Sequence, residues 1–214
     1  MNKDINKNIL EEVHKIALYS TAEYVVEHMH NILPEKNWKD VHTKAIKQIL
    51  NDGLILEFGV YSGETINHIA RHLQSRKVHG FDSFEGLPEA WMPGYDKGRF
   101  KRNDIPEVSG NVKLHIGWFK DSIPKFLKDY NEKIAYLHVD CDLYSSTKTI
   151  FDLLGHLIKK GTIIVFDEYF NYPGWKNGEY KAFQEFVNSN NITYEYLTYN
   201  CVSEQVAVKI VETN

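Results

Sequence analysis

The first fifty residues have the spacing of apolar side chains that is typical of helices. Apolar residues recur at three- and four-residue steps over residues 8–33. Pro34 follows and disfavours helix in the residue before it, so we expect the first helix to end there. A second helix is predicted over residues 41–51, because Gly53 lies where glycine favours a helix C-terminus.

Beyond Gly53, short apolar runs alternate with helical patterns. Such alternation predicts βαβ units, and therefore a parallel sheet that is covered by helices on both faces. The expected strands are residues 54–58, 77–81, 112–116, 134–139 and 162–166. The expected helices between them are residues 64–73, a proline-initiated segment at 123–130, and residues 146–159.

The last forty residues differ from this pattern. A helix is predicted over 179–187, and residues 192–198 and 205–211 alternate as two strands with a short separation, which favours an antiparallel pair at the sheet's edge. The predicted fold class is therefore α/β: a doubly wound, Rossmann-like, mostly parallel seven-stranded sheet with an antiparallel C-terminal hairpin. Residues 1–52 form a predicted helical extension, and residues 53–214 form the main domain. The long connection at 83–111 is expected to be functional.

Composition limits the classes of binding partner and the cellular compartment that we expect for this chain. The chain of 214 residues carries 25 Lys and Arg against 29 Asp and Glu, a net charge of -4, which argues against nucleic acid as the main partner. Its two cysteines lie in no CxxC pair, so no disulfide framework is expected. No apolar run approaches the ~20 residues of a membrane span, and the N-terminus does not resemble a signal peptide. We expect a soluble, cytoplasmic protein without membrane contact.

Two glycines flank the turn between the first predicted strand and the next helix. Gly59 allows the chain to reverse, and Gly63 allows close approach at the helix start, where free N–H groups suit a carboxylate or phosphate. A dinucleotide fingerprint would need glycine where Tyr61 stands. The turn therefore favours a ligand that carries an amino acid group instead of a pyrophosphate, although any tight strand–helix turn can contain two glycines.

Asp82 comes directly after the second predicted strand. In doubly wound folds an acid at this place accepts hydrogen bonds from ribose hydroxyls. The alternative is a carboxylate that caps a helix or stabilises a loop. Together, the glycine turn and this acid indicate an adenosine-type ligand.

Four acids follow the fourth and fifth predicted strands. Asp140 and Asp142 come after one strand, and Asp167 and Glu168 come after the next. Adjacent parallel strands lie about 4.8 Å apart, so these carboxylates would converge at the ligand-binding edge of the sheet and repel one another. Mg²⁺ prefers such oxygen ligands. In the alternative interpretation, Asp140 caps the following helix and the other pair is a solvated loop.

With these residues assembled, the chain resembles class I S-adenosylmethionine-dependent methyltransferases, and more closely the macrocin O-methyltransferase family. The resemblance is carried by four segments that span most of residues 54–175, namely LEFGVYSGETINHIA, VHGFDSFEGLPEAW, LHVDCDLYSSTKTIFDLL and GTIIVFDEYFNYPGW. Some members have two aspartates where this chain has Asp167-Glu168. The N-terminal helices match loosely, and in the family that region contributes to a lid and to subunit contacts, so a homo-oligomer is expected.

The resemblance implies a role for each matching position. The residues implied at the methionine end of the cofactor are Glu57, Gly59, Tyr61, Ser62, Gly63 and Thr65, with Asp140 also beside the cofactor. Those implied at the ribose are Asp82 and Ser83, and those at the adenine are Gly117, Trp118, Asp121 and Ser122. The implied magnesium ligands are Asp140, Asp167 and Glu168, and Asp142 is the implied general base.

The expected function is Mg²⁺-dependent O-methylation, by S-adenosylmethionine, of a hydroxyl on a small molecule. The resemblance favours a sugar or glycosylated acceptor, while a catechol or phenol is an alternative. Residues of the long connection, Trp91, Met92, Tyr95 and Phe100, are expected to cover this acceptor. Two further alternatives are a glycosyltransferase that uses Asp140-Cys141-Asp142 as a metal–diphosphate motif, and a non-catalytic binding protein of the same fold.

Overall fold

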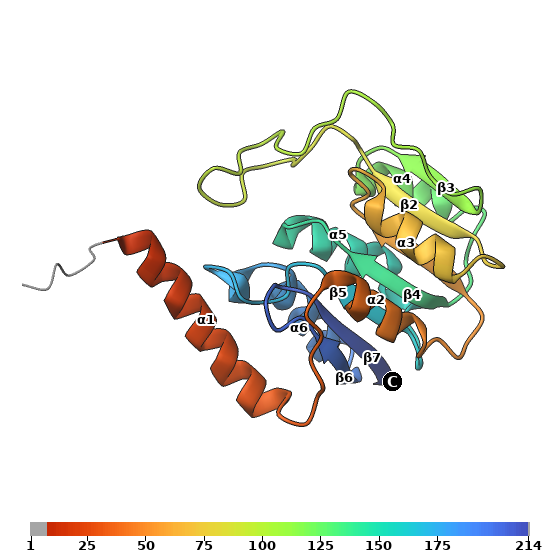
Figure 1. Cartoon of the computed structure of the whole chain (residues 1–214). Coiled ribbons are helices and arrows are strands. Elements are labelled where there is room, and N and C mark those ends of the chain that lie inside the picture. Colours follow the sequence, from red (N-terminus) through yellow and green to blue (C-terminus); the bar gives the residue numbers. More distant parts are fainter. Residues whose placement is uncertain (1–7, 214) are drawn as a thin grey trace, which may run out of the picture.

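The computed structural model describes residues 8–213. The helices are α1 (Ile9–His28), α2 (Trp38–Ile46), α3 (Glu64–His72), α4 (Phe119–Phe126), α5 (Tyr144–Leu154) and α6 (Glu179–Ser189), with 3₁₀ turns η1 (Gly155–Leu157) and η2 (Trp175–Asn177). The strands are β1 (Leu54–Phe58), β2 (Val78–Asp82), β3 (Val112–Ile116), β4 (Ile134–Val139), β5 (Ile163–Phe166), β6 (Thr193–Tyr199) and β7 (Val206–Glu212). Figure 1 shows their arrangement.

These strands form one seven-stranded sheet in the order β3-β2-β1-β4-β5-β7-β6. The first five strands pair in parallel, whereas β7 runs antiparallel between β5 and β6. The order reverses between β1 and β4, which is the switch point where doubly wound sheets bind ligands at their carboxyl edge. The predicted fold class and its C-terminal hairpin are confirmed.

Two apolar layers cover the sheet. Side chains of α2 and α3 pack on one face together with Ile55, and side chains of α4, α5 and α6 pack on the other with Leu56. Every residue of β1, β4 and β5 is buried. Strands that are buried on both faces have continuous apolar runs, which explains why these strands could be predicted from the sequence.

The helix predicted to begin at the proline near residue 123 begins earlier, at Phe119, so that prediction was wrong. Phe119, Ile123 and Phe126 recur at helical spacing, and the last two are buried against the sheet. Pro124 lies inside the helix and lacks an N–H group. The carbonyl it leaves unbonded belongs to Lys120, an exposed residue, so burial of the apolar side chains outweighs the loss.

Three other helix boundaries differ from the predicted ones. The first helix ends at His28 instead of residue 33, because the chain turns at Met29 and buries that side chain in the core. The second begins at Trp38 and ends at Ile46, and Asn37 caps it by accepting the Asp40 N–H. Helix α5, which was predicted over residues 146–159, starts at Tyr144 and ends at Leu154, where η1 follows.

The first two helices relate differently to the sheet. In Figure 1, α1 extends away from the sheet, whereas α2 lies against it. Tyr24 of α1 reaches back and its hydroxyl bonds that of Tyr196 on β6 at 2.5 Å. The lid role and the boundary at residue 52 stay predictions, and residues 1–7 lie outside the described part. In residues 8–213, no helix combines the length and apolar character that crossing a membrane requires.

Two histidines on the edge strand β3 and its neighbour β2 provide a test of this packing by pH. His79 and His115 share a ring-nitrogen hydrogen bond of 3.0 Å, and burial lowers the pKa of each to about 4, with nearby positive charge adding to the effect. Between pH 6.5 and about 4 the unfolded chain therefore binds more protons than the folded chain. This pair should stabilise the fold fully above pH 6.5 and lose that contribution as pH falls towards 4.

We expect His79→Leu to flatten this dependence. Urea unfolding at pH 7 and at pH 5 should show a smaller loss of unfolding free energy in the variant than in the unchanged protein. An equal loss in both proteins would contradict the assignment.

Candidate active site

The turn after β1 depends on the missing side chain of Gly59. Its φ is +93°, and a Cβ atom there would lie 1.6 Å from the carbonyl oxygen of Asp140. No other residue allows the ends of β1 and β4 to approach so closely. Gly63, with φ +80°, is the N-cap residue before α3, while Tyr61 adopts φ 44° without being glycine. The chain thus accepts strained backbone to shape this turn.

Asp82 holds the turn in place. Its Oδ2 accepts the N–H groups of Val60 and Tyr61, both at 2.9 Å, and its Oδ1 accepts that of Phe84 at 2.7 Å. The loop-stabilising role that we weighed as an alternative is therefore real. A carboxylate has about four lone-pair positions, so Asp82 can still accept a further hydrogen bond from a ligand.

The acids after β4 and β5 converge as predicted. Val139 and Phe166 are paired in register, so Asp140 lies beside Asp167 at the carboxyl edge. One carboxylate oxygen from each of Asp140, Asp167 and Glu168 lies within 4.8 Å of the others. Asp142, buried and with φ 60°, lies next to this group. The geometry matches the expected oxygen-only cluster.

The negative charge of this cluster is only partly compensated, by His138, whose Nε2 lies 3.8 Å from Asp167 Oδ1. Burial raises the pKa of Asp140 and of Glu168 well above the usual range, and repulsion from neighbouring acids adds to it. Burial, with Asp167 and Glu204, raises the pKa of Asp142 to about 7. Among residues 8–213, no lysine or arginine forms an ion pair with these acids.

One buried atom of the cluster also lacks a partner. Glu168 Oε2 is out of contact with water and has no hydrogen bond to the described residues. Oxygen ligands, excess negative charge and an unbonded carboxylate oxygen together fit a hard divalent cation such as Mg²⁺. Asp140, Asp167 and Glu168 are the residues that would hold it.

Glu179, the first residue of α6, was missed by the sequence reasoning. Its Oε1 accepts the N–H of Cys141 at 3.2 Å, and its Oε2 accepts that of Glu168 at 3.3 Å. This fully buried carboxylate therefore ties the loops after β4 and β5 together. Burial raises its pKa to about 8. The sequence predicted that Glu179 begins a helix, but it did not indicate these contacts.

Glu57 lies beneath the turn and does not line the cavity, and its implied contact with a cofactor stays a prediction. It is fully buried and paired in register with His138, whose Nδ1 lies 3.0 Å from Glu57 Oε2. Burial would lower the pKa of His138, but Asp167 and Glu57 outweigh it and raise the pKa to about 10. Burial in turn raises the pKa of Glu57, partly offset by His138.

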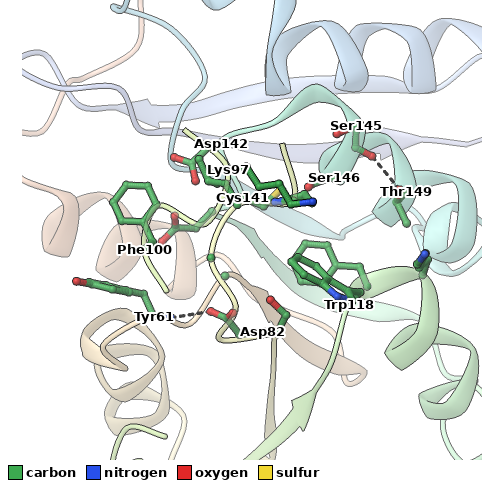
Figure 2. Close-up of a pocket in the computed structure, with 18 of the residues that line it drawn as sticks. Tyr61, Asp82, Lys97, Phe100, Trp118, Cys141, Asp142, Ser145, Ser146 and Thr149 are labelled. Carbon is green, nitrogen blue, oxygen red and sulfur yellow. Dashed lines mark hydrogen bonds between the residues drawn. The ribbon is translucent and has the colours of Figure 1, made fainter. Parts of the chain in front are cut away.

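A cavity of about 590 Å³ opens above the turn and the acids, within the usual range for small-molecule sites (Figure 2). The predicted residues that line it are Gly59, Tyr61, Asp82, Ser83, Trp118, Asp140, Asp142 and Glu168. The predicted residues that do not are Glu57, Ser62, Gly63, Thr65, Gly117, Asp121, Ser122 and Asp167. Several of the residues that do not line the cavity belong to the turns that position the residues that do.

Further lining residues were not singled out in advance. On the long connection they are Gly86, Leu87, Pro88 and Lys97, beside the expected Phe100, whose ring lies 5.8 Å from that of Tyr61. On the sheet edge and α5 they are Cys141, Ser145, Ser146 and Thr149. Trp91 packs on Tyr172 instead of lining the cavity. The α5 residues could have been predicted from the sequence, because this helix directly follows the acids after β4. The cavity contacts of the long connection have no such sequence pattern.

The chain is similar in sequence to a known protein family. The family described as a methyltransferase domain matches residues 56–169, more than half of the chain and all of the segment from the glycine turn to the acids. The chain belongs to this family. The resemblance to class I methyltransferases is thereby confirmed.

Two curated relatives are O-methyltransferases of Streptomyces. Demethyldecarbamoylnovobiocin O-methyltransferase of Streptomyces niveus is 29% identical over 61% of this chain and 58% of its own length. An 8-demethyl-8-(2,3-dimethoxy-alpha-L-rhamnosyl)-tetracenomycin-C 4'-O-methyltransferase of Streptomyces olivaceus is 26% identical over 58% of this chain and 57% of its own length. The matched region thus spans less than two thirds of either relative.

Solved structures share the fold. CalS11, a calicheamicin methyltransferase, aligns with TM-score 0.60 and 22% identity over 90% of each chain. The O-methyltransferase NovP aligns with TM-score 0.60 and 21% identity over 95% of this chain and 98% of its own. At this identity the likeness establishes the methyltransferase fold alone.

The close approach at Gly59 can be tested by substitution. Gly59→Ala should remove the ligand cavity or prevent folding, because the added Cβ would overlap the Asp140 carbonyl. Gly94→Ala is a matched control: its φ is +87°, but nothing lies within 4 Å of the added atom, so only the backbone cost of about 1 kcal/mol remains. Thermal unfolding should separate the two variants, and equal melting temperatures would contradict the analysis.

Proposed function

We propose that this chain is an S-adenosylmethionine-dependent O-methyltransferase that requires a divalent cation and acts on a hydroxyl of a small, sugar-containing molecule. The proposal rests mainly on one observation. The carboxylates of Asp140, Asp167 and Glu168 converge beside the glycine turn at the cavity of a methyltransferase-family chain, and no lysine or arginine among the described residues pairs with them.

The turn side of the cavity suits the cofactor. Gly59 lines the cavity at the turn, and Asp82, already fixed by backbone N–H groups, has capacity to accept from ribose hydroxyls. Trp118 and Phe119 offer apolar surface for a purine. When bound, S-adenosylmethionine supplies a sulfonium methyl group that an oxygen nucleophile can take.

The acid side of the cavity suits the acceptor. A divalent cation held by Asp140, Asp167 and Glu168 would lower the pKa of an acceptor hydroxyl. Asp142, which lines the cavity beside these ligands, is placed to accept the hydroxyl proton while the new O–C bond forms and the C–S bond breaks. Phe100 packs on Tyr61 at the rim, which helps to exclude water.

The acceptor class is suggested by relatives. Their names specify novobiocin and rhamnosyl-tetracenomycin precursors, and CalS11 is named a TDP-rhamnose 3'-O-methyltransferase. Vicinal hydroxyls of a sugar could bind a cation at the oxygen cluster, and so could a catechol. We favour the sugar because of the named relatives, and the catechol is the alternative that a panel of acceptors would reveal.

We also propose that the protein acts as a homo-oligomer in the reducing cytoplasm. Along α1, large apolar side chains lie in solvent, including Ile9, Leu10, Ile16, Tyr19 and Val26, and a second copy could cover them. Cys141 and Cys201 are free thiols, as a reducing compartment requires.

The cation requirement is tested by one substitution and one chelator. Asp140→Asn should lower labelled-methyl transfer to a sugar acceptor at least about a hundredfold, because it removes a charged cation ligand. EDTA should abolish transfer by the unchanged protein, and added Mg²⁺ should restore it. Full activity in EDTA would contradict the role of the cation.

Asp152→Asn is the matched control, since Asp152 is an exposed acid of α5 that forms an ion pair with Lys148. It should leave transfer unchanged. Calorimetry should show S-adenosylhomocysteine binding to the unchanged protein and to both variants. UDP should give no heat, and UDP binding in its place would favour the glycosyltransferase alternative.

A further inference from the structure

Behind the acid cluster, two histidines direct unbonded nitrogens at the same carboxylate. His42 lies on α2 and His138 on β4, and both side chains are fully buried. Their rings meet edge to face, with centroids 4.5 Å apart. The Nε2 atoms of both rings are buried without a hydrogen bond to the described residues. Unsatisfied buried nitrogens are costly, so two of them together require an explanation.

Both rings are oriented through their other nitrogen. His42 Nδ1 bonds the hydroxyl of Tyr136 at 2.6 Å, and His138 Nδ1 bonds Glu57 Oε2 at 3.0 Å. A bound ion requires the tautomer in which Nδ1 donates in each ring, so that Nε2 presents a lone pair. At His138 the ion would take the place of the proton that Asp167 and Glu57 otherwise hold on the ring. Histidines that bind metals show this arrangement, in which the second ring nitrogen donates to a carboxylate or another acceptor that fixes the ring.

Asp167 supplies the third ligand atom. A nitrogen of each histidine and one carboxylate oxygen of Asp167 all lie within 4.8 Å of one another. The separation of His138 Nε2 and Asp167 Oδ1 is 3.8 Å, which is too long for a hydrogen bond. Two ligand atoms on one tetrahedral ion, with bonds of about 2.1 Å, lie about 3.4 Å apart. The observed spacing is therefore close to that of a metal-bridged pair.

We propose a second metal site formed by His42, His138 and Asp167, which takes a borderline transition ion of the Zn²⁺ type. Two imidazole nitrogens and one carboxylate favour such an ion over Mg²⁺, which prefers oxygen ligands. The oxygen cluster and this site share Asp167, whose Oδ2 is held by Gln205 at 3.1 Å. The ion would join α2 to the ends of β4 and β5.

This proposal does not rest on methyl transfer, although the two sites share Asp167. The proposed reaction uses the oxygen cluster on the cavity side, whereas the histidines lie behind it and do not line the cavity. The two proposals can therefore fail separately: methyl-transfer assays test the first, and metal-binding measurements test the second.

The test uses Co²⁺ as a spectroscopic probe of the whole chain in excess Mg²⁺, which occupies oxygen-only sites. Metal-stripped protein should bind one Co²⁺ and give the intense visible absorption of a four-coordinate ion. Zn²⁺ should displace it and raise the melting temperature, because it binds only the folded chain. Absence of this absorption, or a weak spectrum typical of six oxygen ligands, would overturn the proposal.

Substitutions then assign the ligands. His42→Gln should weaken Co²⁺ binding by at least about a hundredfold, and Tyr136→Phe, which removes the orienting hydroxyl but keeps both imidazoles, by about ten- to a hundredfold. His79→Gln is the matched control for loss of a buried histidine and should bind Co²⁺ normally. Asp140→Asn should also retain the absorption. If His42→Gln does not fold, unchanged affinity in Tyr136→Phe would still count against the site.

Discussion

Carboxylates from the ends of β4 and β5 are held together, largely out of water, and no lysine or arginine within residues 8–213 pairs with them. Burial and repulsion favour their protonated forms, as the raised pKa values of Asp140 and Glu168 show. The fold keeps them in place because parallel pairing fixes Val139 beside Phe166, and because Glu179 ties both following loops. These carboxylates therefore favour the binding of a cation, on which the proposed function depends.

The glycine turn determines what can lie beside those acids. Because Gly59 has no side chain, β1 can end against the Asp140 carbonyl, and the cavity can extend from the turn to the carboxylates. Asp82 holds this turn through backbone hydrogen bonds from Val60 and Tyr61, and holds its own loop through a third, from Phe84. A donor near the turn and an acceptor near the acids would thus occupy one continuous space, as direct group transfer requires.

The sequence predicted the buried strands and the chemistry at their ends, since both depend on local runs of apolar residues followed by acids. It did not predict that Glu57 would bond His138 beneath the turn, because that pair depends on the register of strands distant in sequence. The contributions of Lys97 and Glu179 were hidden for a related reason. Loop conformation and tertiary packing place them, and neither leaves a periodic pattern. Pro124 misled the prediction of α4 because packing of its apolar face overrode a local signal.

Anomalous diffraction from crystals of the full chain grown with S-adenosylhomocysteine and Mn²⁺, with zinc excluded, tests the central claim most directly. The account predicts a manganese peak among the carboxylates of Asp140, Asp167 and Glu168, with the product's sulfur in the same cavity above Gly59. A refined complex with no ion at those oxygens, or with the product bound elsewhere on the molecule, would contradict it.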